Sequence, residues 1–125
     1  PLIPGLTDHE LPNLVAAVAE AGAESAGMIL LRLPLTVRPV FLDWLAQHAS
    51  EKREKIEALV RSTRDGQLNQ SKFGQRFRGT GPIADQIQQT FRVFSKKYRL
   101  DGGGTPLDYS RFKPPKPKSG QLRLF

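Results

Sequence analysis

Cysteine is absent from the 125 residues, and histidine occurs only twice. Without thiolates the chain can build neither a disulfide framework nor a cysteine-bound iron–sulfur or zinc site. The two histidines, His9 and His48, lie far apart in sequence and form no ligand-spaced cluster. The sequence therefore predicts no metal site of its own, and it offers no nucleophile with a matching base and orienting residue.

Long apolar runs and a signal-peptide pattern are also missing. The longest apolar stretches are far shorter than the ~20 residues that a membrane-spanning helix needs. We therefore expect a cytoplasmic location and no membrane partner. The chain starts on Pro1 rather than Met, within what looks like a strand. This start predicts a fragment or a processed piece of a longer protein.

Charge is distributed unevenly along the chain. Residues 1–50 carry two Arg and five Asp/Glu, a net charge of −3, whereas residues 51–125 carry 17 Lys/Arg and seven Asp/Glu, a net charge of +10. A half-chain this basic favours partners rich in phosphate, although a solvated basic surface explains most such asymmetries.

The first 35 residues show a strand–helix–strand pattern. "PLIP" at 1–4 is typical of a buried strand that ends at Pro4-Gly5, and the unbroken apolar run "SAGMILLRLP" at 25–34 is typical of a strand buried on both faces. Between them, apolar residues recur with helical spacing at Leu11, Leu14, Val15 and Val18. The pattern predicts a βαβ unit whose neighbouring strands would lie upstream of Pro1.

Three further stretches have helical periodicity, and the chain then changes character. Their apolar faces comprise Val40, Phe41, Trp44 and Leu45; Ile56, Leu59 and Val60; and Ile83, Ile87, Phe91, Phe94 and Tyr98. From "DGGGTP" at 101–106 onward, proline, glycine and lysine predict an extended linker without a core. We therefore divide the chain into residues 1–35, 36–100 and 101–125.

Several separated motifs resemble one family. "PLIPGLTDHELP", "AEAGAESAGMILLRLPL", "FLDWL", "SKFGQRFRGTGPIADQI" and the terminal "QLRLF" occur in the order found in the C-terminal part of radical SAM proteins of the spore-photoproduct-lyase-like group. The resemblance covers nearly all of the chain. It implies an α/β fold, with the last βαβ unit of a partial (β/α) barrel, a three-helix C-terminal extension and a disordered tail.

The same resemblance implies a parent enzyme that uses a [4Fe–4S] cluster and S-adenosylmethionine. The cluster cysteines of that family belong to an N-terminal barrel half, which this chain lacks, so no cofactor is expected on this fragment and it should be inactive alone. Barrel rims that follow strands hold the adenosyl group or face the substrate. The positions implied here are Ile3, Pro4, Gly5, Asp8, Arg32, Leu33 and Pro34. A structural ion pair of Arg32, and a plain turn at Pro4-Gly5, are the alternatives.

The segment "RFRGTGP" at 76–82 suggests an anion site. Arg76 and Arg78 precede two glycines and a helix start, where backbone N–H groups favour anions. A turn with satisfied arginines is the alternative. Phe73 and Phe77 interleave with Lys72 and the arginines, a composition used against single-stranded nucleic acid. We expect these two phenylalanines to be core anchors instead.

The last five residues, "QLRLF", fit the Gln-Leu-x-Leu-Phe pattern with which bacterial replication and repair proteins dock on the DNA sliding clamp. In that mode an extended tether provides reach, and apolar side chains fill a pocket on the clamp. The partner-binding residues would be Gln121, Leu122, Leu124 and Phe125. Folding back onto the domain is the alternative.

Together these patterns predict the C-terminal part of a radical SAM enzyme, with nucleic acid in DNA repair as the candidate substrate and a tail that docks on the sliding clamp. The alternative is a non-enzymatic basic adaptor that binds nucleic acid or a protein partner. The substrate, the reaction and the oligomeric state have no signature in the sequence.

Overall fold

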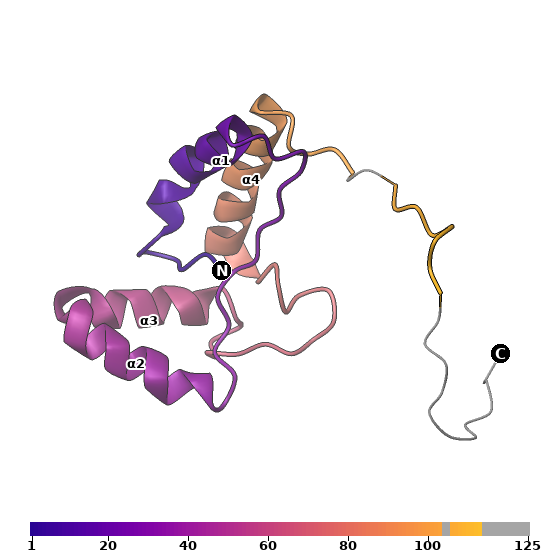
Figure 1. Cartoon of the computed structure of the whole chain (residues 1–125). Coiled ribbons are helices and arrows are strands. Elements are labelled where there is room, and N and C mark those ends of the chain that lie inside the picture. The colour runs from indigo at the N-terminus through magenta and orange to yellow at the C-terminus, as the bar shows by residue number, and fades with distance from the viewer. Residues whose placement is uncertain (104–105, 114–125) are drawn as a thin grey trace, which may run out of the picture.

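The computed structural model describes residues 1–103 and 106–113. Its regular elements are all helical: η1 (Asp8–Glu10), α1 (Leu11–Glu20), α2 (Val37–His48), η2 (Ser50–Lys52), α3 (Arg53–Ser62) and α4 (Gly81–Lys97). Long irregular segments, 21–36 and 63–80, connect them. The fold is therefore a set of two helix pairs joined by extended chain (Figure 1).

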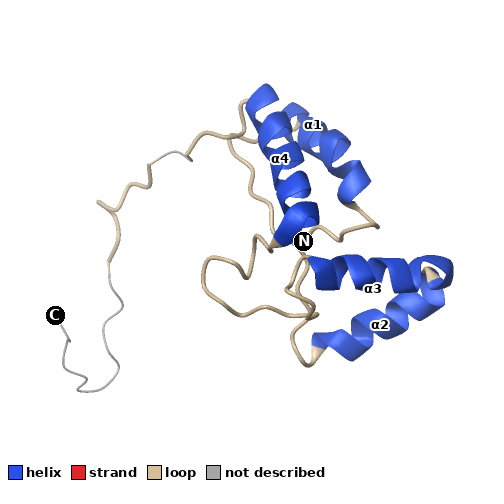
Figure 2. Ribbon diagram, turned by 180° about the vertical axis from the view of Figure 1, so that it is seen from behind, coloured by secondary structure: helices blue, strands red, loops and turns tan. Residues whose placement is uncertain are grey.

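Each helix pair has its own apolar cluster. α1 and α4, which are distant in sequence, lie side by side, and α2 and α3 form the second pair (Figures 1 and 2). The first cluster consists of Leu2, Leu11, Val15, Leu30, Ala84, Ile87 and Leu100. The second consists of Leu33, Leu45, Ile56, Val60 and Leu68. The segment around residues 30–33 contributes to both clusters and so links the two pairs.

The apolar stripe expected on α4 is confirmed. Ile87 is buried in the first cluster, and Ile83, Phe91, Phe94 and Tyr98 pack against that cluster. On α1 the expected face is only partly used, because Leu11 and Val15 are buried whereas Leu14 is 57% exposed. The spacing of apolar residues thus predicts the helix face well where a second helix covers it.

The predicted βαβ unit of a partial barrel is wrong. No strand or sheet forms within the described residues; the two segments expected as strands share a single parallel bridge, Leu2 with Leu30. Two hydrogen bonds make it: the N–H of Leu2 donates to the carbonyl of Ile29 (2.8 Å), and the N–H of Leu31 donates to that of Leu2 (2.8 Å). The segments run parallel but do not form a ladder.

The ladder stops at Pro4, the next residue on the pairing edge, because proline has no N–H to donate to the Leu31 carbonyl and the N–H of Leu33 donates to Leu68 instead. Other backbone groups of the two segments also have partners elsewhere. The N–H of Ile3 donates to the Thr7 hydroxyl (2.9 Å), and the carbonyl of Ile3 accepts from the N–H groups of Leu6 and Thr7. On the other segment, the carbonyls of Leu30 and Leu31 accept hydrogen bonds from a side chain, Arg64. A backbone group that is already satisfied adds nothing to a sheet.

Two further findings bear on function. None of the described helices has both the length and the apolar character to span a membrane. Within the same residues, no three His, Cys, Asp or Glu side chains gather as they would around a metal ion.

Candidate functional site

Arg64 is the largest fully buried side chain, with no exposed surface. It follows the C-terminus of α3, and its guanidinium donates only to backbone carbonyls: those of Leu30 (2.7 Å), Leu31 (3.0 and 3.2 Å), Gln75 (3.2 Å) and Arg76 (3.0 Å). A guanidinium has five N–H donors, so all of them are used. Arg64 thereby ties the 30–31 segment to the 75–76 loop.

This buried cation has no carboxylate partner among the described residues. Burial, and to a lesser extent the positive charge of Arg32, lowers the pKa of Arg64 below its ordinary value. A guanidinium nevertheless keeps its proton at neutral pH. Backbone carbonyl dipoles, rather than an ion pair, therefore stabilise the positive charge of Arg64.

Two further guanidiniums lie near the Phe77 ring. The guanidinium carbon of Arg76 is 4.7 Å from the centre of the Phe77 ring, and that of Arg32 is 5.7 Å from it. The same carbon of Arg76 is 5.8 Å from the ring centre of Phe73. Such distances allow cation–π attraction. We call Arg32, Phe73, Arg76 and Phe77 the basic–aromatic surface.

The expectation that the two phenylalanines anchor the core is wrong. Phe73 is 88% exposed and Phe77 is 42% exposed. Arg32 also lacks the structural ion pair considered from the sequence, since it contacts no carboxylate of the described residues. The guanidiniums of Arg32 and Arg76 contact aromatic rings and make no hydrogen bond among the described residues, which leaves their N–H donors available for an anion.

Backbone contacts hold the loop beneath the basic–aromatic surface. The N–H of Leu30 donates to the carbonyl of Phe77 (2.8 Å), and the N–H of Thr80 donates to that of Thr63 (3.0 Å). Gly79 has a φ of +77°, and a Cβ there would lie 2.9 Å from the Thr63 carbonyl oxygen. Only glycine allows the chain to cross α3 this closely in this conformation.

The start of α4 is a poor anion site, although "RFRGTGP" suggested one. The Thr80 hydroxyl at the N-cap donates to the Asp65 carboxylate (2.6 Å). A carboxylate at this position repels a phosphate from the helix N-terminus. The two glycines, Gly79 and Gly81, instead let the backbone pass close to the carbonyls of Thr63 and Ser62. Anion binding by the arginines of this loop stays a prediction.

The residues suggested for cofactor binding are divided between core and surface. Pro4 and Leu33 are fully buried, and Ile3 packs against the second cluster with Leu33. Gly5, with a φ of +78°, faces Leu59 of α3, so the turn interpretation of Pro4-Gly5 is confirmed. Asp8 lies in η1, and the Pro34 carbonyl accepts the first hydrogen bonds of the turn into α2. Of this set, only Arg32 joins the basic–aromatic surface, and cofactor binding stays a prediction.

Of the other expected anion-binding residues, Lys72 and Arg78 are exposed on the same loop as Arg76. Neither side chain forms a described ion pair. The tail residues Gln121, Leu122, Leu124 and Phe125 lie outside the described residues. Clamp docking therefore stays a prediction.

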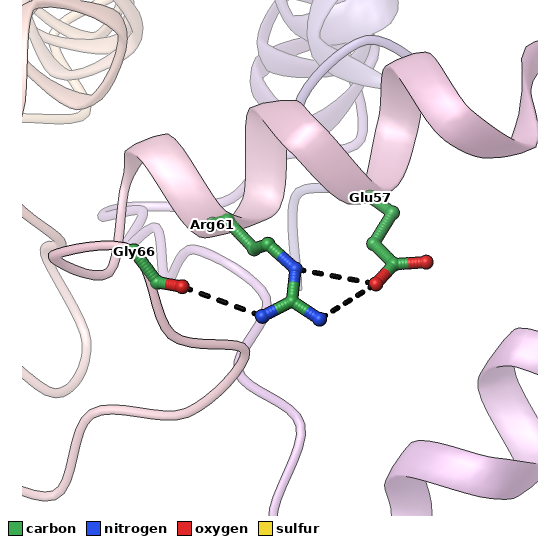
Figure 3. Close-up of polar contacts among 3 residues, drawn as sticks. All are labelled: Glu57, Arg61 and Gly66. Atoms are coloured by element: carbon green, nitrogen blue, oxygen red, sulfur yellow. Dashed lines mark hydrogen bonds and ion pairs between the residues drawn. The ribbon is translucent and has the colours of Figure 1, made fainter.

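Arg64 is the functional residue that sequence patterns do not predict. In "RSTRDG" it is one of two arginines near a helix end, and nothing in the local pattern distinguishes it from Arg61. Arg61 is exposed in part and pairs with Glu57 at 2.7 Å, with a weaker hydrogen bond to the Gly66 carbonyl at 3.3 Å (Figure 3). The burial of Arg64 depends on segments that are distant in sequence, so no local signal identifies it.

Searches of family models, of curated proteins and of solved structures found no match to this chain. The resemblance to the spore-photoproduct-lyase-like group therefore remains a prediction from the motifs. Function must be argued from the geometry itself.

Proposed function

We propose that the chain is a nucleic-acid-binding module and that the basic–aromatic surface contacts a single strand. One observation carries this proposal: the guanidinium carbons of Arg32 and Arg76 lie 5.7 and 4.7 Å, respectively, from the centre of the partly exposed Phe77 ring. Arg64 adds positive charge beneath them, and no carboxylate neutralises the group within the described residues. Phosphate groups of a strand would provide the missing negative charge.

The aromatic residues favour a single strand over a duplex. An open ring such as Phe73, at 88% exposure, offers a stacking face that only an unpaired base can reach. Stacking on an aromatic residue contributes about 1–3 kcal/mol per base. The arginines add phosphate contacts, whose strength falls as salt concentration rises.

The test is fluorescence anisotropy with a labelled 15-nucleotide thymidine strand at several salt concentrations. We expect Phe73→Ala to weaken binding about 5- to 100-fold, the range for loss of one stacked base. Arg76→Gln should weaken binding and make the salt dependence shallower by about one unit of slope. Arg53→Gln, which removes one exposed charge from the start of α3, is the matched control and should change binding little.

Three outcomes contradict the proposal. They are absence of binding by the unaltered chain, binding that does not depend on salt, and equal losses in Arg76→Gln and Arg53→Gln. The last result would assign binding to general net charge rather than to this surface.

The "QLRLF" motif supports a second proposal, docking on the DNA sliding clamp through Gln121, Leu122, Leu124 and Phe125. Purified clamp is titrated with the unaltered chain and with the Leu124→Ala/Phe125→Ala double variant. Docking through this motif requires binding by the first and a loss in the second. Equal binding by both, or by neither, contradicts it.

The two proposals are compatible with a radical SAM parent, because such an enzyme could be recruited to nucleic acid by both contacts. That parentage is tested in the gene that encodes the chain. An in-frame CxxxCxxC motif supports it, and a complete reading frame without this motif favours the non-enzymatic basic adaptor.

A further inference from the structure

A cleft of about 350 Å³ lies between α4, the segment around Met28 and Asp101. α4 contributes Gln88, Phe91, Arg92 and Ser95 to its lining, which is the i, i+3, i+4, i+7 spacing of one helix face. The volume falls within the range of about 300–1,000 Å³ that small-molecule sites occupy. Neither the core nor the basic–aromatic surface accounts for this cleft.

Ser95 gives the cleft an unsatisfied polar group. Its side chain is only 2% exposed, and its hydroxyl has no hydrogen-bond partner among the described residues. A helical serine ordinarily bonds to the carbonyl four residues earlier. A buried hydroxyl without a partner costs about 1–3 kcal/mol. Ser95 lines the cleft but its Oγ is closed off from solvent, so a ligand reaches this hydroxyl when the neighbouring side chains move.

The remaining lining indicates the chemistry of that ligand. Two arginines, Arg78 and Arg92, are among the lining residues, whereas Asp101 is the single acidic one. Phe91 and Met28 add apolar surface. By contrast, the cleft beside α1 that is lined by Leu11 and Leu14 contains no lysine or arginine. The favoured ligand therefore combines an anion with a flat apolar group that has hydrogen-bonding edges, as a nucleotide does.

The cleft adjoins the basic–aromatic surface. Arg78 directly follows Phe77, and the side-chain amide of Gln88 donates to the Arg78 carbonyl at 2.7 Å, which fixes this part of the loop on α4. We propose that the cleft receives the base and phosphate of one nucleotide from a single strand that crosses the basic–aromatic surface. This inference rests on the function proposed above. A free nucleotide has the same chemistry, and the continuity through Arg78 favours the strand.

The test compares two 12-nucleotide strands that have equal numbers of phosphates, a thymidine strand and an abasic strand, by backbone amide NMR shifts of the full chain. We expect the amides of Gln88, Phe91, Arg92 and Ser95 to shift with the thymidine strand and much less with the abasic one. Shifts confined to residues 72–78 would overturn the cleft assignment while leaving the surface proposal intact. No shifts in either region would overturn both.

Ser95→Ala should reduce the preference for the thymidine strand roughly 3- to 10-fold, the contribution of about one hydrogen bond. Arg92→Gln removes a phosphate contact that both strands share, so it should weaken the binding of both strands, whereas Arg53→Gln should change neither. Arg92 is exposed, so its substitution keeps the test valid if Ser95→Ala disturbs folding. Equal affinities of Arg92→Gln and Arg53→Gln for the thymidine strand overturn the inference. Tighter binding of free thymidine monophosphate than of the thymidine strand, measured from the shifts of these amides, also overturns the inference.

Discussion

Arg61 and Arg64 are separated by about one helical turn, yet they lie in opposite environments. Arg61 is partly exposed and pairs with the carboxylate of Glu57, as Figure 3 shows. Arg64 is fully buried and bonds to four backbone carbonyls from two distant segments. Two arginines in the same short stretch therefore have different roles. Arg61 forms a local ion pair near the surface, whereas Arg64 is a buried cation that joins distant segments.

The difference has a consequence for function. The partly exposed pair links groups one turn apart on α3, and Arg61 reaches no further than the Gly66 carbonyl. The buried arginine fixes the carbonyls of Gln75 and Arg76, which directly precede Phe77. Arg64 therefore helps to hold the 75–80 loop against the end of α3, and with it the shape of the basic–aromatic surface.

Of the substitutions that test this difference, Arg64→Leu should lower the stability of the chain the most. The substitution leaves several buried carbonyls without donors, each costing about 1–3 kcal/mol, so we expect a loss of at least about 3 kcal/mol in the free energy of unfolding. Arg64→Lys keeps the charge but has only three donors, and should lie between Arg64→Leu and the unaltered chain. Urea denaturation followed by circular dichroism measures both. A loss below about 1 kcal/mol for Arg64→Leu would show that the carbonyl contacts are dispensable.

Gly79→Ala tests the close approach of the loop to the Thr63 carbonyl at the end of α3. The added Cβ would meet the Thr63 carbonyl oxygen at 2.9 Å in a backbone with a φ of +77°. Gly74→Ala is the matched control, because Gly74 has a φ of +83° in the same loop with nothing within 4 Å of the added atom. We expect both to destabilise, Gly74→Ala by about 1 kcal/mol and Gly79→Ala by about 2 kcal/mol or more. Equal losses of stability for the two variants in thermal denaturation would show that steric contact with the Thr63 carbonyl has no effect.

Phe77→Ala and Phe73→Ala separate stability from binding. Phe77 is contacted by two guanidiniums, each contact contributing about 0.5–1 kcal/mol, so its removal should lower the free energy of unfolding by about 1 kcal/mol. Phe73 is mostly exposed, and its removal should change stability by less than about 0.5 kcal/mol. Parallel urea titrations measure the two values. A larger loss for Phe73→Ala would mean that this ring supports the fold.

Arg61→Ala should have the smallest effect. Exposed i, i+4 ion pairs contribute about 0.3–0.5 kcal/mol, and salt screens them. A double-mutant cycle with Glu57→Ala isolates the pair, and raising the salt concentration should reduce its coupling energy. A coupling above about 1 kcal/mol would place Arg61 in the same class as Arg64 and remove the distinction.

The local patterns in the sequence predicted some elements and missed others for identifiable reasons. Periodicity located the α4 stripe from Ile83 to Tyr98 because a helix face depends on spacing alone. The apolar run at 25–34 predicted a buried strand, and Leu30 and Leu33 are indeed buried. The ladder did not form because Pro4 has no N–H to extend it, and because the Leu31 carbonyl and the Leu33 N–H bond to Arg64 and Leu68, which no pattern in residues 1–35 could reveal.

The candidate site shows the same division. The basic and aromatic residues in 65–81 stand out in the sequence, including Arg76 and the two phenylalanines, but the phenylalanines were assigned to the core. Composition cannot tell whether an aromatic ring faces inward, because that depends on which segment covers it. Here the guanidiniums of Arg32 and Arg76 both contact the Phe77 ring, and Arg32 comes from a segment that is distant in sequence.

By itself, the sequence determined the positions of the helices and the positive charge of the second half, since both follow from residue spacing and composition. Only the tertiary structure decided which arginine is buried and which phenylalanines stay exposed. The physical reason is that burial is a property of contacts between distant segments. The carbonyls that hold Arg64 come from residues 30–31 and 75–76, and they meet it only once the two helix pairs are in place.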